Sequence, residues 1–387
     1  MKRVLIVIAG NNGTIGRCSL NLYEAFRRRE DVETKCVGIH RFDNGLEGLA
    51  DCEYFSDSQS GHNVYKQIKW LKKIKKDFRP DMTISTLFSV NTLNVLTGIG
   101  EYKVGVFHSP HQQLKVFGQI SYLLTLLQYL LLFPRLNQCS CVSEEVVNDL
   151  RGFFSIDKHR IKEIYNVHPI SVIRENSNEK VNTAEIPDGP YFVYTGRLDA
   201  NKAPIRIIKA LKKSRLEVPL VIVGKGDEDF VSELKNEITH LGADSNVVFL
   251  GEKDNPCPYI KQAVALVSSS YSEGLPGVMI EAIALGVPIV STNSSKGVWE
   301  IMSARNAYNA DLDNIWETDC GFITSNRAVK DLSKDTDDIN NLADALRKIL
   351  LRNRGVNNDF LTKVDGHTIT DIYLSLLDSR TKKLTKK

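Results

Sequence analysis

The stretch Glu273-Gly-Leu-Pro-Gly-Val-Met-Ile-Glu281 places two carboxylates on either side of a predicted helix start. Pro276 suits the first turn of that helix, because an N–H group there would have no partner within the helix. The free backbone amides of the turn and the positive end of the helix dipole together favour a bound phosphate. Carboxylates accept hydrogen bonds from hydroxyl groups. These residue types therefore indicate a ligand made of phosphate and sugar.

A second turn, Gly196-Arg197-Leu-Asp-Ala-Asn-Lys202, supplies positive charge. Arg197 and Lys202 are five positions apart across the turn, so both side chains can reach one phosphate group. The guanidinium would bind it as a fork and the ammonium as a point charge.

Two more turns complete the set in this half of the chain. Gly224 and Gly226 flank a lysine, and their missing side chains permit a ligand to approach closely. Residues 291–300, Ser-Thr-Asn-Ser-Ser-Lys-Gly-Val-Trp-Glu, follow a later predicted strand. Ligands of open α/β sheets bind at the carboxyl ends of the strands, so we expect one crevice lined by all of these turns.

Apolar runs that alternate with helical segments predict the sheet that positions these turns. The predicted strands are Tyr191–Thr195, Pro219–Val223, Asn246–Leu250, Ala265–Ser269, Val287–Thr292 and Gly321–Thr324. The predicted helices are Ala203–Lys213, Glu228–Leu241, Asn255–Gln262, Pro276–Leu285 and Ile339–Leu351. Alternation at this period is typical of a parallel sheet.

The first half of the chain shows the same alternation. Its predicted strands are Val4–Ala9, Glu33–Gly38, Met82–Thr86, Lys103–His108, Gln138–Val142 and Ile161–Tyr165. The first strand ends in a glycine-rich turn, residues 10–16, which opens a helix and includes Gly13. His108 lies at the carboxyl end of a strand, where we expect ligands, and His111 follows as a weaker candidate.

The 387 residues are too many for one compact domain and suit two. We predict a first domain over residues 1–172, a polar linker over 173–188 and a second domain over 189–365. Residues 366–387 are predicted to form a C-terminal helix, which would pack back on the first domain, and a basic tail.

Two segments leave membrane contact open. Phe117–Leu136 is rich in leucine but too interrupted to span a bilayer, so it is either a core helix or a helix with one apolar face on a membrane. The tail at residues 380–387 is either a solvated end or a contact for anionic lipid.

The composition excludes several classes of protein. The net charge of +3 implies no acidic partner such as nucleic acid. The seven cysteines are scattered without zinc spacing, which predicts buried thiols in a reducing compartment. The N-terminus enters a predicted strand directly and lacks the pattern of a signal peptide. We therefore expect a cytoplasmic protein.

The residues around Glu273 and Glu281 resemble the signature of the retaining family 4 glycosyltransferases. The turns at Gly196 and Gly224 match other donor-site turns of that family in order and spacing. The likeness is specific from about residue 191 to 302 and weaker in the first half, where residues 10–16, His108 and residues 141–143 fit. It implies a GT-B fold, with two Rossmann-like doubly wound parallel-sheet domains facing a central cleft.

The resemblance also implies roles for single residues. Arg197 and Lys202 would hold the donor diphosphate, Glu281 would bind the ribose and Glu273 would meet the donor sugar. The remaining implied contacts are the amides of Gly274, Leu275 and Gly277 around sugar and phosphate, His108 at the sugar, Gly13 and Gly196 beside the donor, Gly224 and Gly226 at its turn, and Lys253 at the base. Two positions depart from the family pattern: Ala203 and Val167 stand where glycine is usual.

We therefore expect a retaining glycosyltransferase that moves a hexose or N-acetylhexosamine from a nucleotide sugar, UDP-linked in preference to GDP-linked. No Asp-x-Asp pair ends a predicted strand of the second domain, so no metal is required. The apolar segment and basic tail favour a lipid-linked or glycan acceptor in bacterial surface polysaccharide or lipopolysaccharide synthesis, at the cytoplasmic face of the membrane. The alternatives are a soluble sugar acceptor, a non-catalytic nucleotide-sugar binding subunit and a sugar-nucleotide epimerase.

Overall fold

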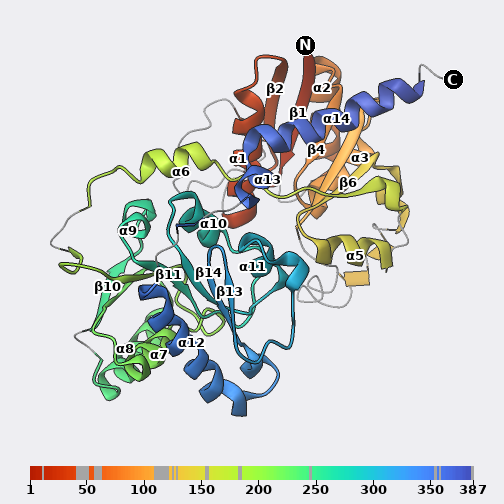
Figure 1. Ribbon diagram of the computed structural model, residues 1–387. Helices are drawn as coiled ribbons and strands as arrows, with labels where there is room; N and C mark the ends of the chain where they lie inside the picture. The colour runs from red at the N-terminus through yellow and green to blue at the C-terminus, as the bar shows by residue number, and fades with distance from the viewer. Residues whose placement is uncertain are drawn as a thin grey trace. The chain divides into compact units, whose positions relative to one another are not determined.

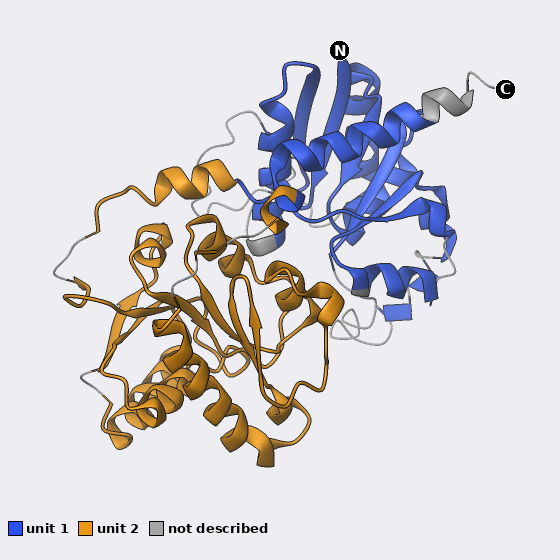
Figure 2. Ribbon diagram, in the orientation of Figure 1, with its two compact units in different colours: residues 1–169, 363–387 blue, residues 170–362 orange. Residues whose placement is uncertain are grey.

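The chain folds into two α/β units, each with its own sheet (Figure 1). The computed structural model describes residues 1–10, 13–40, 52–55, 63–108, 122–123, 126–127, 130–152, 157–181, 185–243, 246–352, 355–356 and 359–384. The first unit comprises residues 1–169 and 363–387, and the second comprises residues 170–362 (Figure 2). The predicted boundary at residue 172 falls inside helix α6 (Ile170–Asn176), which opens the second unit and takes up the start of the predicted linker.

The first unit is built on a seven-stranded sheet in the order β3-β2-β1-β4-β5-β6-β7, and all of its strand pairs are parallel. The strands are β1 (Lys2–Ile8), β2 (Val32–Gly38), β3 (Glu53–Tyr54), β4 (Met82–Ser85), β5 (Tyr102–Phe107), β6 (Gln138–Cys141) and β7 (Ile161–Glu163). Residues 4–8 are fully buried, as expected for a parallel strand covered on both faces. Six of these strands are predicted from apolar runs, and the two-residue β3 is too short to leave such a signal.

Helices cover this sheet. They are α1 (Gly13–Arg27), α2 (Val64–Phe78), α3 (Phe88–Leu96), α5 (Glu144–Gly152) and α14 (Gly366–Leu384). The short helix α13 (Phe360–Val364) spans the boundary between the two units. Helix α14 packs along α1: the rings of Phe26 and Tyr373 lie 6.2 Å apart, and Arg29 pairs with Asp371 at 2.6 Å. The C-terminal helix is therefore part of the first unit. The basic tail beyond residue 384 lies outside the described residues.

The apolar segment predicted over residues 117–136 is described only in part. Leu126 and Leu132 pack against the buried cluster around Phe133, whereas other leucines of the segment face outward. The exposed side chains, with their exposed fractions, are Leu123 (63%), Leu127 (51%), Leu130 (58%) and Leu131 (57%). The described part of the segment thus has both buried and exposed apolar side chains. No helix in the described ranges is long and apolar enough to cross a membrane.

The second unit has a seven-stranded sheet in the order β10-β9-β8-β11-β12-β14-β13. The strands are β8 (Phe192–Thr195), β9 (Leu220–Val223), β10 (Val247–Gly251), β11 (Ala265–Ser268), β12 (Ile289–Thr292), β13 (Ile315–Thr318) and β14 (Gly321–Thr324). The predicted parallel sheet is confirmed with one addition, because β13 pairs antiparallel with β14 at the edge. That strand is only partly buried, so it carries no continuous apolar run.

The helices of the second unit are α6, α7 (Pro204–Ser214), α8 (Glu228–His240), α9 (Cys257–Lys261), α10 (Gly277–Ala284), α11 (Lys296–Ile301) and α12 (Asp335–Leu350). Helices α7 and α12 pack on the sheet through one apolar cluster that includes Ile207 and Leu346. Helix α6 and the segment after it also belong to this unit, because Arg174 donates to the carbonyl of Ala284 and Lys253 pairs with Glu185.

The strand order reverses once in each sheet, between β1 and β4 and between β8 and β11. At such a point the loops after the two central strands diverge and leave a crevice at the carboxyl end of the sheet. In the second unit these are the loops that contain Lys202 and Glu273. Topology alone therefore brings the two predicted site turns together.

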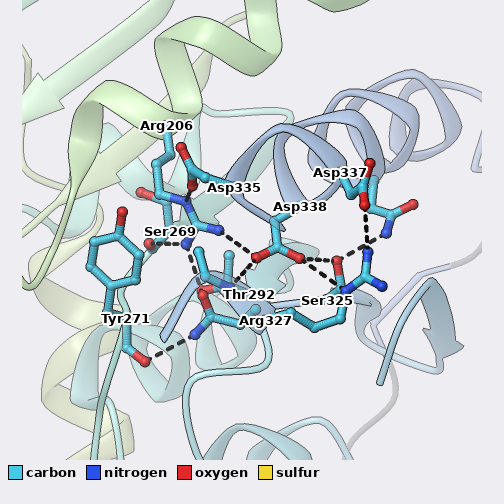
Figure 3. Close-up of polar contacts among 12 residues, drawn as sticks. Arg206, Ser269, Tyr271, Thr292, Ser325, Arg327, Asp335, Asp337 and Asp338 are labelled. Carbon is cyan, nitrogen blue, oxygen red and sulfur yellow. Dashed lines mark hydrogen bonds and ion pairs between the residues drawn. The ribbon is translucent and has the colours of Figure 1, made fainter. Parts of the chain in front are cut away.

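A buried ionic cluster contacts the backbone of the loop that contains Glu273 (Figure 3). Arg206 of α7 is 2% exposed and reaches Asp335 at 3.0 Å and Asp338 at 3.3 Å, both on α12. Its guanidinium also donates to the backbone carbonyl of Ser269 at 3.2 Å and lies 4.7 Å from the ring centroid of Tyr271. A charge this deep is tolerated only when it is paired and hydrogen-bonded.

Neighbouring polar groups complete the cluster. Asp338 is fully buried and also accepts from the hydroxyl of Ser325 at 2.5 Å and the amide of Ala328 at 2.8 Å. Asn326 accepts from Arg206 and donates to the carbonyl of Tyr271 at 2.9 Å. The cluster thus ties α7 and α12 to the backbone that leads into Glu273.

The Arg206→Met variant should lower the free energy of unfolding by about 3–5 kcal/mol, because it removes a buried cation from the fully buried Asp338 and the partly exposed Asp335. The matched control is Arg197→Met, since Arg197 is 78% exposed and should shift stability by about 0.5 kcal/mol at most. Urea unfolding of both variants measures the difference. Equal losses in the two variants would contradict the role given to the buried cluster.

Candidate functional site

The turn between β8 and α7 is organised by Asp199. Its carboxylate accepts from the backbone amide of Lys202 at 2.8 Å and pairs with the guanidinium of Arg197 at 3.3 Å. The buried Tyr194 hydroxyl donates to the carbonyl of Arg197 at 2.5 Å, and burial raises the pKa of that tyrosine. The turn is therefore held at both ends while the Arg197 side chain extends outward.

Lys202 and Glu273 form the centre of the site. Their side chains pair at 2.5 Å and are 22% and 12% exposed, so the pair is partly shielded from water. The hydroxyl of Ser270 donates to the same carboxylate oxygen at 2.6 Å. This arrangement joins the β8–α7 turn to the loop after β11. Two predicted site residues that lie 71 positions apart thereby come into contact.

The two loops are also joined by hydrogen bonds to backbone carbonyls. The amide of Tyr271 donates to the carbonyl of Asn201 at 2.8 Å, and the Asn201 side chain donates to the carbonyl of Ser272 at 2.9 Å. Ser269 donates to the carbonyl of Ala203 at 2.8 Å. The relative position of Lys202 and Glu273 therefore rests on backbone contacts as well as on their own ion pair.

Ala203 adopts a left-handed conformation, with φ 45° and ψ 51°. A residue with a side chain pays about 1–2 kcal/mol for this region, whereas glycine does not. The family pattern has glycine at this position, and the left-handed backbone conformation explains that preference. The second departure, Val167, is 3% exposed, and its carbonyl accepts from Asn21 within the first unit.

Gly224 and Gly226 pack against the neighbouring turn. A Cβ on Gly224, whose φ is 153°, would lie 1.8 Å from the carbonyl oxygen of Gly196. A Cβ on Gly226 would lie 2.2 Å from the carbonyl oxygen of Leu198. The missing side chains therefore let two backbone turns touch, a reason that the sequence does not reveal. Their assignment as donor-binding residues remains a prediction.

The loop before α10 contacts the start of α11 through the carbonyl of Gly274, whereas the space beside the Cα of Gly274 is empty. Ser295, the N-cap of α11, donates to the carbonyl of Gly274 at 2.8 Å, and a Cβ on Gly297 would lie 2.1 Å from that oxygen. A Cβ on Gly274 would instead meet no atom within 4 Å. The α10 helix then begins at Gly277, after the predicted Pro276 start, with Leu275 half-buried beside it. Free amides at this end suit an anion.

The remaining predicted residues of the second unit lie beside this helix. Glu281 is half-buried in the second turn of α10. Burial and, secondarily, the Glu281 charge raise the pKa of the Cys257 thiol on α9 to about 11. Lys253 follows β10 and pairs with Glu185 at 2.8 Å, which raises its pKa.

Two predicted residues belong to the first unit. His108 directly follows β5 and lines a small cavity with Ser19 and Thr86, which follows β4. Burial lowers the pKa of His108 to about 4, so the imidazole is neutral at pH 7. Gly13 begins α1. His111 lies outside the described residues.

Several residues of the site were missed by reasoning from sequence. Asp199 lies in the turn from Gly196 to Lys202, and its spacing from Lys202 is a weak signal for an Asx turn. Arg206 and Asn326 leave no such signal, because their partners are distant in the chain. The partner of Ser270, Glu273, is only three residues away, but a serine at that spacing is too common to mark a site. Among the described residues no group of three or more side chains could hold a metal ion.

Replacing two glycines of the site should affect stability to very different extents. Gly224→Ala should lower the free energy of unfolding by about 3 kcal/mol or more, because it adds a backbone clash to an unfavourable φ. Gly274→Ala should change it by about 0.5 kcal/mol at most, since open space receives the methyl group. Urea unfolding measures both changes. A stable Gly224→Ala variant would show that the two turns do not pack as described.

Comparison with known proteins relates part of this chain to a family and to several named relatives. Residues 175–353 match the family described as glycosyl transferases group 1. An uncharacterised glycosyltransferase of Methanocaldococcus jannaschii is 26% identical over 277 residues, which are 67% of each chain. A Campylobacter jejuni relative is 27% identical over 171 residues, 44% of this chain and 45% of its own length. That relative is named N-acetylgalactosamine-N,N'-diacetylbacillosaminyl-diphospho-undecaprenol 4-alpha-N-acetylgalactosaminyltransferase.

A solved structure shows the same fold. The crystal structure of the Anabaena protein HepE in complex with UDP has a TM-score of 0.68 and 17% identity, covering 98% of this chain and 100% of that one. Residues 175–353 are thus similar to the glycosyl transferases group 1 family, and the two Rossmann-like units of the chain have the GT-B fold.

Proposed function

We propose that this chain is a retaining glycosyltransferase of family 4 that moves a hexose or an N-acetylhexosamine from a nucleoside diphosphate sugar. The observation that carries the proposal is the Lys202–Glu273 pair at the switch point of the second sheet. There a cation for phosphate and a carboxylate for sugar hydroxyls lie next to the N-terminus of α10. Arg197 stands at the other end of the Lys202 turn.

The proposed chemistry uses these groups at the departing diphosphate. The bond between the anomeric carbon and the diphosphate oxygen breaks, and a bond to an acceptor hydroxyl oxygen forms on the same face of the sugar. The acceptor proton passes to the leaving diphosphate. Negative charge therefore builds on phosphate, and fixed donors aimed there stabilise the transition state. Arg197 and Lys202 would supply that charge without a metal ion.

The other predicted residues take donor-binding roles in this proposal. Glu281 would accept from the ribose hydroxyls, and Lys253 would lie at the base. The amides of Gly274, Leu275 and Gly277 would surround sugar and phosphate. Gly196, Gly224 and Gly226 would shape the turns beside the diphosphate. From the first unit, His108 would contact the sugar and Gly13 would let the first loop approach the donor.

UDP is the proposed nucleotide. The crystal structure of the Anabaena protein with the same fold is a complex with UDP, which supports UDP over GDP. The sequence reasoning favours the same nucleotide.

A lipid-linked or glycan acceptor of bacterial surface polysaccharide or lipopolysaccharide synthesis is the proposed second substrate. The Campylobacter relative is named for an acceptor on diphospho-undecaprenol. Exposed leucines at positions 123, 127, 130 and 131 supply an apolar face that suits peripheral contact with a membrane. The proposal places the protein at the cytoplasmic face of that membrane.

Arg197→Ala should lower the turnover of sugar transfer by roughly 10²–10³-fold, because it removes one donor to the leaving diphosphate. Glu281→Ala should mainly raise the KM for the nucleotide sugar, since ribose contacts are equal in ground and transition states. Transfer from radiolabelled UDP-sugars to lipid extracts and to soluble glycans measures both effects. The matched control is Lys209→Ala on α7, which pairs with Glu237 away from the site.

Unchanged transfer by both the Arg197 and Glu281 variants would overturn the donor-site assignment. Transfer to soluble glycans alone would leave a glycosyltransferase but remove the lipid-linked acceptor. UDP-sugar binding without transfer or hydrolysis would indicate the non-catalytic alternative.

Addition of UDP should raise the melting temperature more than addition of GDP at equal concentration. A ligand stabilises the folded state by RT ln(1 + [L]/Kd), so 100 Kd of ligand contributes about 2.7 kcal/mol. A thermal-shift series with UDP, GDP and their sugars measures the preference. Glu281→Ala should reduce the UDP shift, whereas Lys209→Ala should not. A larger shift with GDP would assign a different base.

A further inference from the structure

Helix α2, with the sequence Val-Tyr-Lys-Gln-Ile-Lys-Trp-Leu-Lys-Lys-Ile-Lys-Lys-Asp-Phe, concentrates positive charge on the first unit. It carries six lysines and one aspartate in 15 residues, whereas the whole chain has a net charge of only +3. The excess charge on this helix is therefore local and is balanced elsewhere in the chain. None of the functional roles above uses these lysines.

One of the six lysines faces the protein interior. Lys75 is fully buried and pairs at 2.6 Å with Glu101, which has no exposed side-chain surface. Its ammonium also donates to the side chain of Asn94 on α3 at 2.8 Å. Leu71 and Ile74 lie on the same buried side of α2. These contacts fix which way the helix faces.

The other five lysines, which we call the α2 lysine face, are all exposed: Lys66, Lys69, Lys72, Lys73 and Lys76. The spacing of Lys66, Lys69, Lys73 and Lys76 is that of one stripe along a helix. All five line a hollow of about 500 Å³ together with Trp70 and Asp77. The face spans roughly 15 Å at the helical rise of 1.5 Å per residue.

Apolar side chains stand at the start of this helix. Val64 is 51% exposed and Tyr65 is 75% exposed. Beyond the other end, carboxylates mix with the cations, because Lys76 also lines a hollow that contains Asp81 and Asp378. The uniformly basic surface thus ends at Lys76.

We propose that the α2 lysine face binds the anionic surface of a lipid bilayer. The choice of a membrane as partner rests on the proposed lipid-linked acceptor. The positive charge of the α2 lysine face is independent of that proposal. Lysines near anionic lipid attract it from within a Debye length, and apolar side chains beside them add contact with the acyl boundary. Val64, Tyr65 and the exposed leucines suit a bilayer, whereas a nucleic-acid backbone gives them no apolar partner.

The test uses the full chain and sedimentation with vesicles. One set of vesicles is phosphatidylcholine alone, and the other holds about a third phosphatidylglycerol, a level at which surface charge attracts basic segments. Wild type should bind the anionic vesicles more tightly, and added salt should weaken that binding by screening. The Lys66→Gln/Lys69→Gln/Lys73→Gln variant should bind them roughly 100-fold more weakly, since each of the three lysines contributes about fivefold.

The matched control is Lys209→Gln/Lys212→Gln/Lys213→Gln, which removes the same charge from α7 of the second unit. It should retain binding within about twofold of wild type, because Lys209 is already paired with Glu237 of α8, which offsets part of the charge on α7. Leu123→Gln/Leu127→Gln measures the apolar face separately. Melting temperatures check that each variant is folded.

Equal binding by the α2 variant and the α7 variant would overturn the proposal, as would equal binding of wild type to both kinds of vesicle. Retention on RNA without sedimentation on anionic vesicles would also overturn it and indicate a nucleic-acid partner. UDP-sugar hydrolysis without vesicles separates the two proposals. Its absence in wild type counts against the glycosyltransferase, and its persistence in the α2 variant shows that only membrane binding was lost.

Discussion

The buried guanidinium of Arg206 is the constraint on which the second unit depends. It joins two helices and the backbone of the loop after β11 through the carboxylates of Asp335 and Asp338 and the carbonyl of Ser269. An ionic group at this depth is tolerated only while all of its partners are in place. The interior of this unit therefore specifies one arrangement of the loop, and this arrangement fixes the position of Glu273 in the site.

The candidate site forms where two loops meet at the switch point of the sheet, the point at which the strand order reverses. Glycine at 224 and 226 lets neighbouring turns touch, and Ser270 and Lys202 hold the carboxylate of Glu273. A partly shielded ion pair is stronger than one in bulk water. The proposed chemistry needs cations that are already in place when charge develops on phosphate, and rigid backbone contacts meet that need better than mobile side chains.

The first unit differs in where its charge lies. Lys75 is paired in the interior, while the remaining lysines of α2 and the exposed leucines of residues 122–131 face outward. Basic and apolar surface on one unit provides the two kinds of contact that peripheral membrane binding requires. A lipid-linked acceptor would then be met at the surface where it resides, which joins the proposed membrane contact to the proposed reaction.

The sequence by itself determined the two α/β units, most of the strands and the turns that carry Arg197, Lys202 and Glu273, because apolar period and glycine-rich turns are local signals. Only the tertiary structure decided that α6 begins the second unit, that β13 runs antiparallel and that Gly224 serves backbone packing. Arg206 likewise reads as an ordinary basic residue of a helix. Its role depends on carboxylates more than 125 positions away, and contacts at that separation leave no local pattern.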